Sequence, residues 1–111
     1  MTLVIEKIAA TIVASVKGSL DPAQDALIET HLLAQIDKGE RRIALDLAGA
    51  HIVSPPGIRV VLLLDRLLRQ HDGRLVVCNM TADVRTSFST CGALPLLTVT
   101  DTRAQALGVL A

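Results

Sequence analysis

The chain is almost without aromatic residues and carries no net charge. Phe88 is the only aromatic among 111 residues, and 11 Lys and Arg balance 11 Asp and Glu. Without aromatic side chains there is little for nucleic acid bases to stack on, and without a net positive field nothing draws the chain to nucleic acid or to an anionic membrane. We therefore expect no nucleic acid partner, and any protein interface must use aliphatic and arginine contacts.

Cysteine and long apolar runs are also scarce. Cys78 and Cys91 lack C-x-x-C spacing, which favours reduced thiols over a disulfide, and Cys78 falls in a run typical of a buried strand. The longest apolar run, Val60 to Leu64, is far shorter than the roughly 20 residues that span a bilayer. The N-terminus shows no basic region followed by an apolar core, so we expect a cytoplasmic protein with no direct membrane insertion.

The length and composition predict a single globular domain, residues 1–111. Half of the residues are hydrophobic and a fifth are charged, as in ordinary globular chains. Strand patterns occur at residues 3–6, 11–17, 43–47, 75–78 and 96–99. Helix patterns occur at residues 22–38, 55–70, 82–91 and after Thr102. This order predicts an α/β fold: a mixed, mostly parallel sheet with an N-terminal hairpin and about four helices.

The junction between the third strand and the second long helix has the strongest local signals. Residues 48–53 are interpreted as a loop, and Ser54 is a good N-cap before Pro55, which fits the first helical position. A helix start usually offers free N–H groups to a phosphate or carboxylate. Because Pro55 and Pro56 have no N–H, we do not expect a phosphate or nucleotide site here.

The order and spacing of several short motifs point to a family across nearly the whole chain. These motifs are Gly18-Ser19-Leu20-Asp21, Ile43 to Leu47, Val53 to Leu62, Gly73 to Asn79, and Val84-Arg85 with Phe88 and Gly92. Together they resemble the STAS domain of bacterial anti-sigma factor antagonists. The resemblance implies a partner switch, in which such a protein binds an anti-sigma factor that is also a serine kinase of the ATPase type and so frees the sigma factor.

The chain departs from the pattern of the family's phosphorylated members. Aligned on Gly57, the position of the acceptor serine or threonine is Pro55, which has no hydroxyl. The resemblance therefore implies that the usual phosphorylation does not occur at that residue. Ser54, one position earlier, is the nearest substitute acceptor, but it also reads as an N-cap whose oxygen accepts from the Gly57 N–H.

We expect the protein to work by binding, through one surface. Its predicted residues are Asp21, His51, Ser54, Gly57 and Arg59. Two alternatives remain open: a structural STAS subunit of a signalling scaffold or of a lipid-transport ABC complex, and, more remotely, a small-ligand binder. A homodimer also remains open.

Catalytic and metal-binding patterns are weak. His31, His51 and His71 form no i,i+4 pair and have no acidic neighbour at metal-ligand spacing, so no metal is expected. Asp46 interrupts an apolar strand, and backbone N–H groups of residues 48–53 would satisfy it in a structural role. No phosphate loop, nucleophile elbow or acid pair is present, so we predict no catalytic residue and no cofactor.

Overall fold

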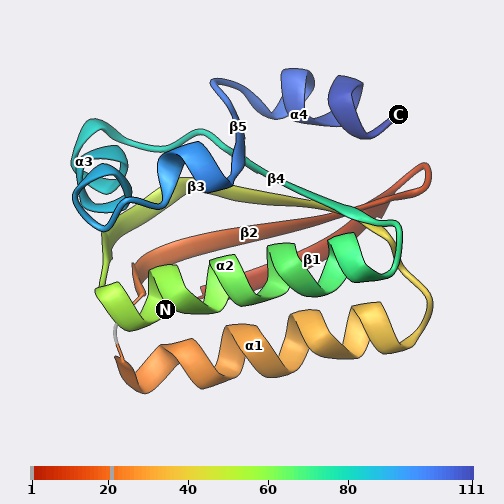
Figure 1. The fold of residues 1–111 in the computed structure, drawn as a ribbon, viewed down its shortest axis with the longest axis horizontal. Coiled ribbons are helices and arrows are strands. Elements are labelled where there is room, and N and C mark those ends of the chain that lie inside the picture. Colours follow the sequence, from red (N-terminus) through yellow and green to blue (C-terminus); the bar gives the residue numbers. More distant parts are fainter. Residues whose placement is uncertain (1, 21) are drawn as a thin grey trace.

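The computed structural model describes residues 2–20 and 22–111 (Figure 1). The elements in chain order are β1 (Thr2–Ile8), β2 (Thr11–Leu20), α1 (Pro22–Asp37), β3 (Arg42–Val53), α2 (Pro55–Gln70), β4 (Arg74–Cys78), α3 (Ala82–Thr90), the 3₁₀ turn η1 (Leu94–Leu96), β5 (Thr98–Thr100) and α4 (Arg103–Leu110). A hairpin followed by alternating helices and strands confirms the predicted α/β class.

The strands form one sheet in the order β1-β2-β3-β4-β5. β1 is antiparallel to β2, and the other three pairings are parallel. The sheet is therefore mixed and mostly parallel, with the hairpin at one edge, as predicted. Because β3 and β4 run in the same direction, each of them ends at the side of the molecule where the next helix begins (Figure 1).

Helices cover both faces of the sheet. α1 and α2 pack side by side along one face, and α4 lies on the other, over β3 and β4 (Figure 1). Along β3, Ile43 and Leu45 belong to the large core under α1 and α2, whereas Ala44 belongs to a smaller core under α4. The smaller core consists of Val13, Ala44, Val76, Cys78, Ala106 and Leu110, so the prediction that Cys78 is a core residue is confirmed.

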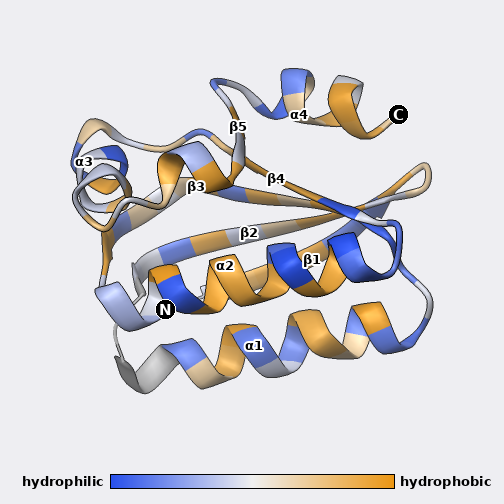
Figure 2. Cartoon of the chain, viewed as in Figure 1, coloured by the Kyte–Doolittle hydropathy of each residue, from blue (hydrophilic) through white to orange (hydrophobic). Residues whose placement is uncertain are grey.

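Helix α2 is amphipathic, which explains how it docks on the sheet. In α2, Ile58, Val61, Leu64 and Leu68 are buried at spacings of three and four residues. Figure 2 shows apolar (orange) segments along α1 and α2 interrupted by hydrophilic (blue) ones. The apolar positions at this spacing face the sheet, whereas Leu63 is exposed and Asp65 is buried.

The loop predicted at residues 48–53 is wrong, because β3 continues to Val53. β2 likewise extends beyond the predicted Lys17, and its last residues pair with the second half of β3, up to Leu20 with Val53. Gly49 permits this pairing where the register shifts, since a Cβ there would lie 2.9 Å from the Lys17 Cγ. Backbone pairing between two distant segments thus outweighed the weak strand preference of a local sequence that contains Ala48, Gly49 and Ala50.

Two further predictions near the C-terminus need correction. The strand predicted at residues 96–99 is shorter and later, Thr98–Thr100, because Leu94–Leu96 form a 3₁₀ turn that contains Pro95. The helical spacing of Val84, Phe88 and Cys91 predicts that all three are buried on one face of α3. Val84 and Phe88 are buried, but Cys91 is exposed because the helix ends there and Cys91 is its C-cap. None of the helices in the described ranges is both long and apolar enough to cross a membrane.

Candidate partner-binding surface

The start of α2 is closed to anions. Ser54 is the N-cap in an extended conformation, and its Oγ accepts from the Gly57 N–H at 3.4 Å. The Ile58 N–H donates to the Ser54 carbonyl at 3.0 Å, while Pro55 and Pro56 have no N–H. The first four helical residues therefore offer no free donor to a phosphate, and the predicted capping role of Ser54 is confirmed.

The predicted partner-binding residues from position 51 to 59 lie together, where β3 ends and α2 begins. His51 and Arg59 are exposed, Ser54 is half-buried, and Gly57 is buried. His51 lies on a strand rather than in the predicted loop, next to Ile52, whose side chain is 62% exposed. Asp21 lies outside the described residues. Among the described residues from position 51 to 59, the exposed side chains are those of His51, Ile52, Pro55, Pro56 and Arg59.

A cleft between α2 and α3 adjoins these residues. Its volume is about 210 Å³, and its walls are Val53, Pro55 and Ile58 on one side and Thr86, Ser87, Thr90 and Cys91 on the other. Sequence reasoning missed this cleft, since only tertiary packing brings α3 to the start of α2. The cleft therefore offers a partner one apolar wall, and the opposite wall carries mainly small polar side chains.

A second hollow, of about 250 Å³, follows the outer side of α2. Arg59, Leu62, Leu63 and Arg66 line it, and Leu63 is 45% exposed. In the described part of the chain, neither arginine has a carboxylate within ion-pair distance. Two guanidinium groups without an ion pair among the described residues, beside the exposed Leu63 and the half-buried Leu62, suit a partner that offers both carboxylates and aliphatic side chains.

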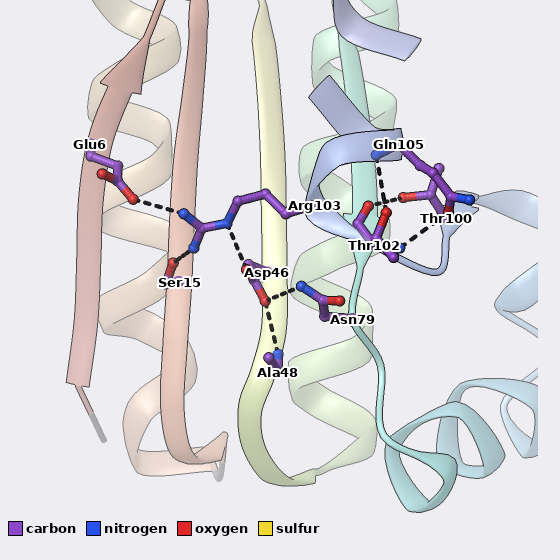
Figure 3. A network of polar contacts seen from close by, with 9 residues as sticks. All are labelled: Glu6, Ser15, Asp46, Ala48, Asn79, Thr100, Thr102, Arg103 and Gln105. Carbon is purple, nitrogen blue, oxygen red and sulfur yellow. Dashed lines mark hydrogen bonds and ion pairs between the residues drawn. The ribbon is translucent and has the colours of Figure 1, made fainter. Parts of the chain in front are cut away.

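Asp46 is held by several hydrogen bonds at the centre of the sheet (Figure 3). Its Oδ1 accepts from the Ala48 N–H at 2.9 Å and from Asn79 Nδ2 at 3.2 Å, and its Oδ2 accepts from Arg103 Nε at 2.9 Å. Burial alone would raise the pKa of Asp46, but the hydrogen bonds from Ala48, Arg103 and Asn79 together hold it below the usual value. The prediction that a backbone N–H satisfies this carboxylate is confirmed.

Arg103 extends this network across the sheet. From the first turn of α4 it donates to Ser15 Oγ on β2 at 2.8 Å and to Glu6 Oε1 on β1 at 3.0 Å, in addition to Asp46 (Figure 3). A capping box between Thr102 and Gln105 fixes the same turn. Arg103 therefore fastens α4 to three strands, and Asp46, its partner on β3, has a structural role.

The three histidines lie apart. His31 is on α1, His51 on β3, and His71 caps the C-terminal end of α2. Within residues 2–20 and 22–111, no three His, Cys, Asp or Glu side chains come together in a way that could hold a metal ion.

Comparison with known families decides the classification. Residues 2–106 match the family described as the STAS domain. The chain belongs to the STAS domain family. Its nearly complete match agrees with the single domain and with the fold seen here.

Related proteins place this STAS domain among the anti-sigma factor antagonists. BtrV of Bordetella bronchiseptica, described as a candidate anti-sigma factor antagonist, is 40% identical over 103 residues, which are 93% of this chain and 89% of BtrV. A Thermotoga maritima structure with the same description has a TM-score of 0.92 at 13% identity, covering 97% of this chain and 93% of that one. Bacillus SpoIIAA in its phosphorylated form has a TM-score of 0.77 at 21% identity, covering 99% and 100%. At these identities the two structures establish the fold alone.

Proposed function

We propose that this STAS domain is a cytoplasmic anti-sigma factor antagonist that acts by binding an anti-sigma factor, without catalysis. The 40% identity to BtrV supports this class of function. The observation that carries it is the surface at the start of α2, where Arg59 and Ile52 are exposed beside two hollows lined by apolar and polar side chains. Such a surface has the mixture of arginine and aliphatic groups that protein interfaces use.

The proposed partner is an anti-sigma factor that is also a serine kinase of the ATPase type. Pro55, which has no hydroxyl, occupies the position that the family's phosphorylated members use as acceptor. The Oγ of Ser54, the nearest hydroxyl, is half-buried and engaged with the Gly57 N–H. We therefore propose that the kinase binds this domain without phosphorylating it at the usual position.

The test begins with a pull-down from the native host, in which mass spectrometry identifies a serine kinase bound to the wild-type domain. The purified kinase and ATP are then added to wild-type, Ser54→Ala and Pro55→Ser proteins, followed by size-exclusion chromatography and phosphopeptide mapping. We expect a complex with unmodified wild-type protein and phosphate on residue 55 only in the Pro55→Ser variant.

Other outcomes would overturn parts of this proposal. Stoichiometric phosphate on Ser54 of the wild-type protein, absent from Ser54→Ala, would contradict binding without phosphorylation. Recovery of transporter or scaffold subunits in place of a kinase would favour the structural-subunit alternative. The same chromatography reports whether the domain forms a homodimer.

A further inference from the structure

A groove lies at the end of the sheet opposite the start of α2, where β3 and β4 begin. Its volume is about 590 Å³, and it lies between the β1–β2 hairpin, the turns before β3 and β4, and the end of α4. Its charged lining residues are Lys7, Glu40, Arg41, Arg42, Asp72 and Arg74. The groove is therefore net positive, although the chain as a whole carries no net charge.

Some of these charges already have partners. Lys7 Nζ pairs with Glu40 Oε1 at 2.7 Å. The Arg41 guanidinium donates to the carbonyls of Ile36 and Glu40, both at 2.9 Å, and so completes the end of α1. The side chains of Lys7, Glu40 and Arg41 therefore have structural roles within the fold.

Arg42 and Arg74 also line the groove, but within the described ranges their charges are not paired in this way. They are directly paired positions of the parallel strands β3 and β4, and both are exposed. No carboxylate among the described residues lies within ion-pair distance of either. Neighbouring like charges on adjacent strands repel one another unless an anion lies between them. Asp65, which pairs with Arg69, acts on Arg74 from beyond ion-pair distance. The two arginines therefore present guanidinium groups that an external anion would satisfy.

The backbone around the groove favours carboxylates over a phosphate group. The Gly73 N–H donates to the Leu68 carbonyl at 2.6 Å, and the Arg74 N–H donates to the Arg41 carbonyl at 2.8 Å. Free backbone N–H groups, which phosphate sites commonly use, are thus missing at this point of the rim. Guanidinium groups pair with carboxylates and phosphates alike, so the preference for carboxylates rests on the engaged N–H groups and on the apolar part of the lining. Ala10 and Val109 add apolar lining, and Val109 is 40% exposed.

We propose that this groove binds an acidic, extended segment of a partner protein, with its carboxylates on Arg42 and Arg74 and an aliphatic side chain against Val109. The groove is separate from the surface at the start of α2, and the two can be occupied together. The proposal therefore stands independently of the anti-sigma factor assignment.

The probe is a synthetic peptide of alternating glutamate and leucine, titrated into the isotopically labelled full chain and followed by NMR. We expect amide shifts concentrated at residues 40–42, 73–74 and 109–111. The double variant Arg42→Gln with Arg74→Gln should weaken peptide binding by about tenfold or more. The matched control, Lys17→Gln with Arg85→Gln, removes the same charge from two exposed positions outside the groove and outside the surface at the start of α2, and should change affinity by less than about twofold.

Three results would overturn the proposal. The first is no saturable shift with about 1 mM peptide at low salt, which corresponds to negligible affinity. The second is equal affinity in the groove variant and its control, with thermal melts showing both folded. The third is inorganic phosphate producing the same shifts at lower concentration than the peptide, which would make the groove a small-anion site.

Discussion

Asp46 Oδ2 and Arg103 Nε form a 2.9 Å ion pair that joins β3 to the first turn of α4, across 57 residues of sequence (Figure 3). The carboxylate side is buried, with 7% of its side chain exposed, while Arg103 is 36% exposed. Because the same guanidinium also reaches Glu6 and Ser15, one side chain couples α4 to β1, β2 and β3. Arg103 thus ties the helix that covers the smaller core to three strands of the sheet.

Removing that guanidinium should destabilise the fold. Arg103→Met keeps the aliphatic stem but leaves the Asp46 carboxylate with only the Ala48 and Asn79 donors, and we expect a loss of about 2 kcal/mol in the free energy of unfolding. Urea unfolding measures this change in the free energy of unfolding. Arg85→Met, at an exposed position on α3, is the matched control and should shift stability by less than about 0.5 kcal/mol. Equal stability of the two variants would show that the network contributes nothing.

Acid should weaken the same contact. The pKa of Asp46 is lower in the folded protein than in the unfolded chain, so the unfolded chain takes up the proton first as the pH falls. The stability that the charged Asp46 contributes to the fold is therefore lost as pH falls below about 4. We therefore expect the stability difference between wild type and Asp46→Asn to be largest above about pH 5 and to shrink in acid.

Asp65 should show the opposite dependence of stability on pH. Burial raises its pKa, and the ion pair with Arg69 offsets this only in part. The folded protein then binds this proton more readily than the unfolded chain does. As pH rises through the pKa of Asp65 in the folded protein, the buried carboxylate becomes charged and the fold loses stability. Relative to wild type, Asp65→Asn should become more stable with rising pH. Parallel pH trends in the Asp46→Asn and Asp65→Asn variants would contradict these assignments.

The cap of α2 should have a measurable effect on stability. Ser54→Ala removes the oxygen that accepts from the Gly57 N–H, and we expect a loss of about 1 kcal/mol. Ser89→Ala, on the exposed side of α3, replaces a serine by a better helix former and should not destabilise. Chemical denaturation compares the two, and an unaffected Ser54→Ala protein would show that the 3.4 Å contact is too weak to act as a cap.

Two glycines should respond to alanine in opposite ways. A Cβ on Gly73 would lie 2.6 Å from the Arg41 carbonyl oxygen and 3.0 Å from Leu68 Cδ2, so Gly73→Ala must displace backbone and should cost about 1 to 3 kcal/mol. A Cβ on Gly108, in α4, meets nothing within 4 Å. Gly108→Ala should stabilise by up to about 1 kcal/mol through helix propensity. A neutral Gly73→Ala protein would mean that the β4 entry is looser than this geometry.

Sequence reasoning succeeded where short-range rules act and failed where distant segments meet. The Ser54 cap followed by Pro55 could be predicted because capping depends on the next three residues. The extension of β3 through Val53 could not, since it depends on pairing with Leu20 of another strand. Arg103 was missed for the same reason, because only the packed fold brings it to Asp46.

The most direct test of the proposed partner surface is isothermal titration calorimetry of the wild-type and Arg59→Glu proteins with the anti-sigma factor kinase. Arg59 is exposed and has no ion pair in the described part of the chain, so reversing its charge should leave the melting temperature nearly unchanged. We expect affinity to fall by about tenfold or more, because reversing an interfacial charge juxtaposes like charges. Lys38→Glu, at the other end of the molecule, should bind like wild type. Wild-type affinity in Arg59→Glu would contradict the placement of the partner surface at the start of α2.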